Sequence, residues 1–327
     1  MIGYVIRRLL MMIPMLFMVS LLTFIIIQLP PGDFLNSLVI QMSEQGTAVD
    51  PSELAALRAQ YGLDQPFYMQ YLLWISHIVF HGDFGMSFEW NRPVRELVLD
   101  RIGMTVVLAL LTLIAVWLVA LPVGILSAIK RKSAGSRIAN LVAFLGLATP
   151  DFVVALVLMY LSLNLFGQSV GGLFSPEFMN APWSLAAVAD LISHLWIPII
   201  AGGAASAASL IRIMRANLLD EINKPYVVTQ RAMGHSEAFI ILRYPLRVAL
   251  NPFVGTIGWL LPGLVSGATI SAIVLNLATT GPMLLRALLS QDMYLAGGII
   301  LLLSTLTMIG TLISDLLLAW LDPRVRL

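Results

Sequence analysis

Two histidines are the first candidates for chemistry in this sequence. His77 and His81 are four residues apart, so a helix would place both side chains on one face, as in a zinc site. Zinc peptidases with this spacing carry a glutamate directly after the first histidine, but Ile78 stands there. We therefore expect no metal site and interpret the pair as packing at an interface.

Other common catalytic patterns are missing from the sequence. There is no GxxxxGK[ST] phosphate loop, and none of the lysines, Lys130, Lys132 and Lys224, follows a suitable glycine run. The chain contains no cysteine, which excludes disulfides, thiolate catalysis and Cys-ligated zinc. An intramembrane enzyme would also require paired histidines or aspartates in facing spans. We expect no catalytic residue and no cofactor site in this chain.

Composition indicates the fold class. Hydrophobic residues make up 59% of the 327 residues and charged residues 11%, so the chain is far more apolar than an ordinary soluble domain. The net charge of +1 gives no indication of nucleic-acid binding. We expect an all-α polytopic membrane protein with about six transmembrane helices of ~20 residues each. The predicted spans are residues 9–29, 103–129, 138–166, 191–211, one beginning near residue 253, and 295–318.

The predicted spans divide the chain into three parts. Residues 1–29 form an N-terminal transmembrane helix, which we expect to be retained because it is longer than a signal-peptide core and lacks a small-x-small cleavage site. Residues 30–101 form a loop domain, and residues 102–327 form a core of five helices that contains a polar loop, 219–251. Beyond the fifth span, Gly281 and Pro282 predict a break followed by a short re-entrant or surface helix.

The basic residues predict the orientation. Most lysines and arginines lie in the N-terminus, in 130–137, in 212–247 and in the C-terminal tail, so these segments and both termini are expected in the cytoplasm. Acidic residues outnumber basic ones in 30–101, which is expected outside. Its aromatic residues, Trp74 and Trp90 among them, indicate a small folded cap that lies partly on the membrane interface.

Asp151 is an ionisable residue near the middle of the third predicted span. An aspartate there raises the free energy of insertion by ~2.5 to 3.5 kcal/mol, which favours a function in the translocation path or in gating. The alternative is that Asp151 caps a backbone break at Pro150. Both interpretations stay open. The other candidates for gating are residues that would loosen the fifth span, although glycine and proline are also common in membrane helices: Pro262, Gly263 and Gly267.

The cytoplasmic loop has the pattern of two short helices. A first helix begins after Lys224 and ends at Gly234, and Ser236 suits the N-cap of the second, with Glu237 in its first turn. Apolar residues of the second helix, away from lipid, require a partner surface. The alternative is a folded loop that packs only on its own spans. The expected apolar positions are Phe239, Ile240, Leu242 and Leu246.

This loop resembles the EAA-type coupling loop of binding-protein-dependent ABC importer permeases, in their dipeptide and oligopeptide branch. The resemblance extends over nearly the whole chain, because the first span, the external loop and the tail also match in order. The residues that carry it in the coupling loop are Tyr226, Arg231, Ala232, Gly234, Arg243, Arg247 and Pro252. Those elsewhere are Pro31, Gly32, Asp33, Gly62, Leu63, Asp64, Pro66, Gly82, Asp83, Gly85, Ser87, Pro93, Asp315, Asp322, Pro323 and Arg324.

The resemblance implies a type I importer permease in the inner membrane of a bacterium or archaeon, embedded in lipid and providing half of a pore. Its implied partners are a homologous second permease, two cytoplasmic ATPases that bind ATP and magnesium, and a periplasmic or lipid-anchored solute-binding protein. The residues implied to couple to an ATPase are Tyr226, Gln230, Arg231, Ala232, Met233 and Gly234, with Arg231 pairing with partner carboxylates and the second helix fastened to its own bundle. Trp74 and Trp90 would contact the binding protein.

Two features depart from the family pattern. Gln230 stands where many members have alanine, and Met233 varies the end of the motif. The region after the fifth span, ISAIVLNLATTGPMLL, also lacks the usual glutamate and PGLG-like turn. The solute class therefore stays open between oligopeptides and oligosaccharides. The alternative function is a self-sufficient secondary carrier or channel, which would require ionisable groups in several spans.

Overall fold

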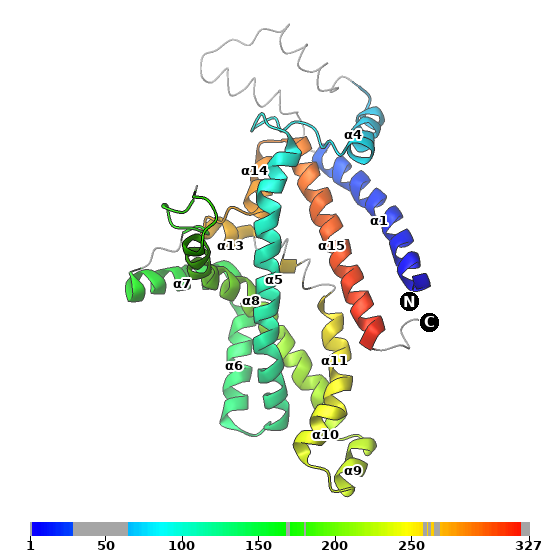
Figure 1. The fold of residues 1–327 in the computed structure, drawn as a ribbon, viewed down its shortest axis with the longest axis vertical. Helices are drawn as coiled ribbons and strands as arrows, with labels where there is room; N and C mark the ends of the chain where they lie inside the picture. The colour runs from blue at the N-terminus through cyan, green and yellow to red at the C-terminus, as the bar shows by residue number, and fades with distance from the viewer. Residues whose placement is uncertain are drawn as a thin grey trace. The chain divides into compact units, whose positions relative to one another are not determined.

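A computed structural model describes residues 2–28, 65–167, 171–179, 181–257, 260, 263–264 and 269–321 (Figure 1). Within these ranges the regular structure is helical, apart from one isolated antiparallel bridge between Met86 and Pro93. The expected all-α class is thus confirmed. Several residues that carried the resemblance lie outside the described ranges: Pro31, Gly32, Asp33, Gly62, Leu63, Asp64, Asp322, Pro323 and Arg324.

The described helices include four that are long and apolar enough to cross a membrane. They are Gly3–Ile26 within α1 (Ile2–Gln28), α5 (Val94–Ile129), α8 (Leu185–Ile222), and Met293–Trp320 within α15 (Met293–Leu321). The pair α6 (Ala134–Ala148) and α7 (Asp151–Phe166) would add a fifth if it counts as one span. The described residues therefore contain four or five candidate spans, and the predicted count of six is not confirmed. Part of the predicted fifth span lies outside the description.

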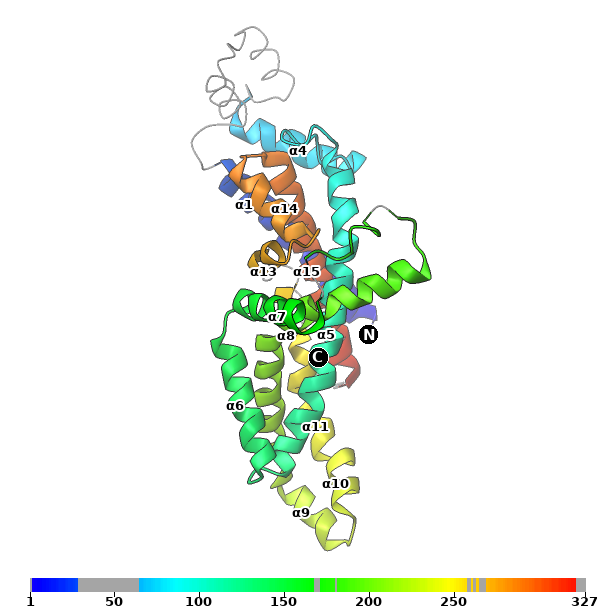
Figure 2. The ribbon, with the colours of Figure 1, turned by 90° about the vertical axis from the view of Figure 1, so that its left-hand side faces the viewer.

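The third predicted span is not one continuous helix, and the break lies at Pro150, where the sequence left a backbone break open as an alternative. The direction of the chain changes by 108° between α6 and α7. The cause is local, because Pro150 disfavours the helical conformation at the preceding residue. Thr149 is accordingly extended, with φ −97° and ψ 125°, and α6 ends there. In Figure 2, α7 runs across the direction of α6.

The chain divides into two compact units. The first contains residues 1–5, 104–278 and 307–327, and the second contains residues 6–103 and 279–306. The change from residue 103 to 104 falls close to the predicted boundary of the external domain. The second unit differs from that predicted domain because it also contains most of α1, all of α14 (Thr280–Leu289) and the beginning of α15.

The core of the first unit forms where α5, α8 and α11 (Pro245–Gly255) pack together. Leu210, Met214 and Phe253 are fully buried there, and Trp117 packs edge-on against Phe253 with ring centroids 4.9 Å apart. Glycine lets α5 approach α8, since a Cβ on Gly124 would lie 2.8 Å from the Cβ of Met214. A second apolar cluster in this unit joins α7, α8 and α13 (Thr269–Val274).

The core of the second unit is aromatic. Phe24 of α1 packs against Tyr71 and Trp74 of α4 (Phe67–His81), and Leu301 of α15 completes the cluster. The Tyr71 hydroxyl also hydrogen-bonds the Ser20 hydroxyl of α1 at 2.9 Å. The α4 helix ends at Gly82, whose φ of +63° belongs to the left-handed region that glycine favours. The short helix expected after the fifth span is present as α14.

Candidate functional site

The predicted coupling loop folds as two short helices after the end of α8. The first is α9 (Pro225–Ala232) and the second is α10 (Glu237–Arg243), which leads into α11 (Figure 1). Gly234 in the turn has φ +81°, and its amide donates to the Arg231 carbonyl oxygen at 3.0 Å. The predicted bend at Gly234 is confirmed, because few residues other than glycine adopt this φ without strain. Ser236 takes the N-cap position of α10, though its side chain makes no capping bond.

Glu221 anchors the start of the loop. It lies in the last turn of α8, is 8% exposed, and forms an ion pair with Lys224. The Tyr226 hydroxyl donates to Glu221 Oε2 at 2.6 Å. Burial, together with this hydrogen bond, raises the pKa of Tyr226 well above its ordinary value, so the phenol stays protonated and remains a donor. The carboxylate therefore fixes the direction in which α9 leaves α8.

Arg231 ties the two short helices together. Its Nε donates to Glu237 Oε1 at 2.6 Å and its Nη2 to Glu237 Oε2 at 3.2 Å, so the pair is bidentate. A third bond reaches the Ile222 carbonyl oxygen at 3.5 Å. The hydrogen bonds between the two side chains lower the pKa of the Glu237 carboxyl and raise the pKa of the Arg231 guanidinium. The resemblance implied that Arg231 pairs with a partner's carboxylate; in this structure it is held by a carboxylate of its own chain.

The apolar side chains of the loop fall into two groups. Val227 of α9 and Ile240 of α10 are fully buried; α10 packs on both α9 and α11. Val228, Met233 and Leu242 are instead 53%, 64% and 66% exposed. The predicted anchoring by the second helix therefore holds for Ile240 and the partly buried Leu246, whereas Phe239 and Leu242 are exposed. These exposed apolar side chains belong to α9, α10 and the turn between them, and we call them the coupling loop surface.

The other residues of the predicted motif lie in or beside this surface. Gln230 is half-buried in the last turn of α9, and its amide nitrogen lies 3.8 Å from the Met233 sulfur. Ala232 is exposed at the end of α9. The turn thus presents small and flexible side chains to the solvent.

The gating candidates are separated in the fold. Pro150 takes the N-cap position of α7, and Asp151 is half-buried in its first turn, where a carboxylate interacts favourably with the helix dipole. Among the described contacts, Asp151 accepts no hydrogen bond. Gly263 is helical and exposed, whereas Pro262 and Gly267 lie outside the described residues. These positions are not brought together into one site by the described residues.

The two tryptophans predicted to contact a binding protein have different surroundings. Trp74 is 5% exposed and packs on Phe24, with ring centroids 5.8 Å apart, so its described contacts are internal. Trp90 is half-buried, and the guanidinium of Arg286 lies 5.0 Å from the centroid of its ring. Their contact with a binding protein stays a prediction.

Sequence reasoning missed a buried carboxylate beside Trp90. Asp292 is fully buried just before α15 and accepts from the Ser87 hydroxyl at 2.5 Å, from the Glu89 amide at 3.2 Å and from the Leu295 amide at 3.1 Å. Burial raises the pKa of Asp292, and these hydrogen bonds oppose the shift. Arg286 of α14 adds an ion pair to Glu89 at 2.5 Å. We call Asp292, Ser87, Glu89 and Arg286 the Asp292 cluster.

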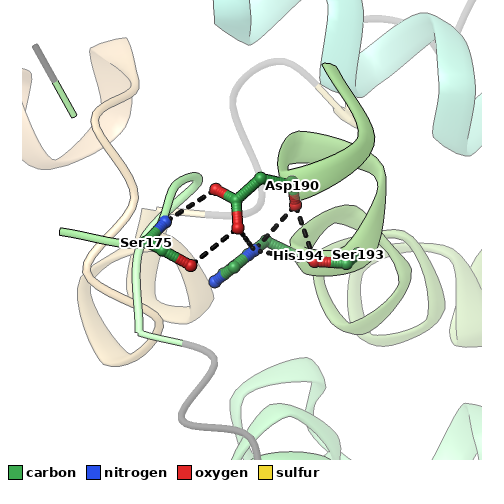
Figure 3. A network of polar contacts seen from close by, with 4 residues as sticks. All are labelled: Ser175, Asp190, Ser193 and His194. Carbon is green, nitrogen blue, oxygen red and sulfur yellow. Dashed lines mark hydrogen bonds and ion pairs between the residues drawn. The ribbon is translucent and has the colours of Figure 1, made fainter. Parts of the chain in front are cut away.

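A second polar network that the sequence did not indicate lies in the first unit (Figure 3). Asp190 of α8 accepts from the Ser175 amide at 2.8 Å and from its hydroxyl at 2.6 Å. His194 Nδ1 lies 2.8 Å from the Asp190 carbonyl oxygen, a contact that requires the proton on Nδ1. Ser193 is close to the same nitrogen, at 3.1 Å.

These residue types are those of a serine hydrolase, but their arrangement differs. A nucleophilic serine must lie at the histidine nitrogen opposite the one that faces the aspartate. Here Ser175 donates to the carboxylate itself, and Ser193 lies at Nδ1, the nitrogen on the Asp190 side, so neither of these serine contacts is with the opposite ring nitrogen (Figure 3). The network therefore braces the segment before α8 against that helix.

No metal centre is found within the described ranges, where no group of three or more histidine, aspartate or glutamate side chains is placed to hold an ion. His77 and His81 are adjacent on α4 as predicted, with ring centroids 5.9 Å apart and rings nearly perpendicular. Their contact is an edge-on aromatic one, in agreement with packing.

Comparison with known proteins identifies the family. Residues 120–327 match the family described as binding-protein-dependent transport system inner membrane component, and residues 1–109 match the N-terminal domain of such membrane components. The chain is 32% identical over 326 residues to an oligopeptide transport system permease protein of Bacillus subtilis, which covers 99% of both chains. It is 31% identical over 326 residues to a glutathione transport system permease protein of Escherichia coli, covering 100% of this chain and 99% of the other. The chain therefore belongs to the binding-protein-dependent inner membrane components, and it is a multi-pass permease subunit of an ABC importer.

Proposed function

We propose that this permease forms half of a pore for short peptides and that α9 and the following turn dock on a cytoplasmic ATPase. One observation carries the docking proposal: a helix–turn–helix that is fixed internally by Glu221 and Arg231 leaves Val228, Met233 and Leu242 exposed. A rigid unit with an apolar surface is suited to enter a cleft of a partner. The ATPase would bind ATP and magnesium, and its motion would reach the bundle through α10 and α11.

The proposed arrangement places both termini and the coupling loop in the cytoplasm. The concentration of lysine and arginine in and around the coupling loop, the 130–137 turn and the two ends of the chain supports this orientation. The remaining partners would be a second permease that completes the pore and an external binding protein that delivers the solute. The names of the two relatives, an oligopeptide permease and a glutathione permease, support peptides as the solute class.

The docking proposal is tested with two matched variants in the complete transporter. Val228→Glu places a charge on α9, where Val228 is 53% exposed, and Val248→Glu makes the same change on α11, where Val248 is 45% exposed. We expect Val228→Glu to lower solute-stimulated ATP hydrolysis at least about tenfold, because a charge in an apolar interface opposes docking. Val248→Glu should retain most of the stimulation.

Two results would count against docking. Full stimulation in the Val228→Glu transporter would show that this surface is not the ATPase contact. Equal loss in both variants would indicate general damage to the cytoplasmic side. The solute class is measured separately, by uptake of labelled tripeptide, glutathione and oligosaccharide into vesicles that contain the transporter; uptake of the oligosaccharide alone would reject the peptide proposal and leave the docking proposal intact.

A further inference from the structure

A polar groove lies between α6 and α8, and its lining includes no residue of α9, α10 or the turn between them. Its volume is about 720 Å³, and its polar lining consists of Asn140, Ser209, Arg212, Arg215 and Asp220. All of these residues belong to the first unit. Because Asn140 is the contribution of α6 and the others come from α8, the groove follows the contact between the two helices.

Arginine dominates the charge of this groove. Arg212 is exposed, and among the described residues nothing lies within ion-pair or hydrogen-bond distance of its guanidinium. Arg215 uses one donor, since its Nε lies 3.4 Å from the Ser127 carbonyl oxygen. Asp220 is an exposed carboxylate about two turns further along α8, and it pairs with no described cation. The inner part of the groove is therefore positively charged.

The two arginines lie where α8 leaves its apolar stretch. Residues 195–211 contain no charge, and Arg212 is the first charged residue after them. The contact of Arg215 with Ser127 places this level beside the last turn of α5, next to the cations of the 130–137 turn. Charged side chains at the end of an apolar span reach the headgroup region of a bilayer, where anionic phosphates attract arginine.

An apolar surface continues from the groove along α6. Phe144 is one helical turn from Asn140 on the same face and is 64% exposed. Leu141, which is 60% exposed, is likewise one helical turn from Arg137 on the same face. A molecule that lies along this face would thus meet cations at one end and hydrocarbon along the rest. A phospholipid has this distribution, whereas a free phosphate would gain nothing from the apolar part.

We propose that the groove between α6 and α8 binds the headgroup of an anionic phospholipid, with its phosphate at Arg212 and Arg215 and an acyl chain along Leu141 and Phe144. The planar guanidinium suits phosphate oxygens because it donates two parallel hydrogen bonds. Asn140 and Ser209 add neutral donors to the same wall. Asp220 marks the far limit of the site, since its carboxylate repels an anion. Such a lipid would hold the α6–α8 pair at a fixed depth in the membrane.

The test uses native mass spectrometry of the complete, delipidated transporter. Dioleoyl phosphatidylglycerol and dioleoyl phosphatidylcholine are titrated separately into the wild type, Arg212→Gln and Arg131→Gln. Arg131 is an exposed cation of the neighbouring turn that does not line the groove, so it is a matched control. We expect Arg212→Gln to weaken phosphatidylglycerol binding about fivefold, the effect of one cation near the headgroup, whereas Arg131→Gln changes it less than about twofold.

Arg212 makes no described contact within the chain, so its replacement should leave folding unchanged; the melting temperature of each purified variant checks this. Equal binding of the two lipids, or an equal loss of phosphatidylglycerol binding in the two variants, would show that a basic surface attracts lipid without a specific site. Either result would overturn the proposal. A photoactivatable phosphatidylglycerol provides a second measurement, with cross-links expected in residues 134–148 and 205–220. A photo-cross-linker at position 212 that captured another subunit instead of lipid would also overturn it.

Discussion

Two polar assemblies, the Asp292 cluster and the coupling loop, hold short helical segments by similar chemistry, but their side chains differ greatly in solvent exposure. In the Asp292 cluster the central carboxylate is fully buried and accepts bonds from three donors, the Ser87 hydroxyl and the amides of Glu89 and Leu295. In the coupling loop the Glu237 side chain is 60% exposed and Arg231 is 35% exposed. A buried acceptor cannot be replaced by water, whereas an exposed ion pair competes with water at every moment. The first is therefore suited to permanent structure and the second to a segment that moves with a partner.

The largest expected effect of this difference is on stability. Asp292→Ala leaves the Ser87 hydroxyl and two backbone amides without their acceptor, and we expect it to lower the free energy of unfolding by about 3 kcal/mol. The measurement is thermal unfolding of the purified protein in detergent. The control is Asp100→Ala, which removes a 61% exposed carboxylate paired with Arg92 at 3.6 Å. A surface pair of this kind contributes about 0 to 1 kcal/mol, so equal shifts in the two variants would contradict the comparison.

The two assemblies also differ in how far the sequence predicts them. The helix–turn–helix of the coupling loop was predictable because its signals are local: Gly234 allows the turn and Ser236 stands before the second helix. The pair of Arg231 with Glu237 was not predicted, although the two residues are close in the chain. The Asp292 cluster joins residues 205 positions apart, from Ser87 to Asp292, so no local pattern indicates it. Asp190 and Ser175 were missed for the same reason, since the loop between them decides whether they meet.

Hydropathy predicted four of the candidate spans among the described residues, but it did not predict the angle between α6 and α7. Residues 138–166 have the composition of one span, yet the chain turns by 108° between α6 and α7. The signal for the break was Pro150, where the sequence left a backbone break open as one of two interpretations; hydropathy did not decide between them, because the apolar run continues past the proline. Family membership favours the importer over a self-sufficient carrier, the alternative that composition alone left open.

A charge exchange shows whether Arg231 acts within its own chain. Arg231→Glu places two carboxylates together at the α9–α10 contact, and we expect solute-stimulated ATP hydrolysis to fall about tenfold, a coupling loss within the usual range. The double variant Arg231→Glu with Glu237→Arg restores opposite charges and should recover most of the stimulation. If the double variant stays as inactive as the single one, Arg231 pairs with a partner instead, and the contrast with the Asp292 cluster loses its basis.

The smallest expected effect is a pH dependence of the coupling loop. Hydrogen bonding to Arg231 lowers the pKa of Glu237, so the ionised carboxylate stabilises the folded loop above the unfolded pKa of a glutamate, and this contribution disappears as the pH falls through the lower, folded pKa. The amides of Gly234 and His235, which donate within the turn, report it by hydrogen exchange. At neutral pH they should be better protected in the wild type than in Glu237→Gln, and the difference should vanish in acid. A difference that persisted unchanged at low pH would mean that the Glu237 charge does not stabilise the turn, and the rigidity of the docking unit would then depend on Glu221 and its partners alone.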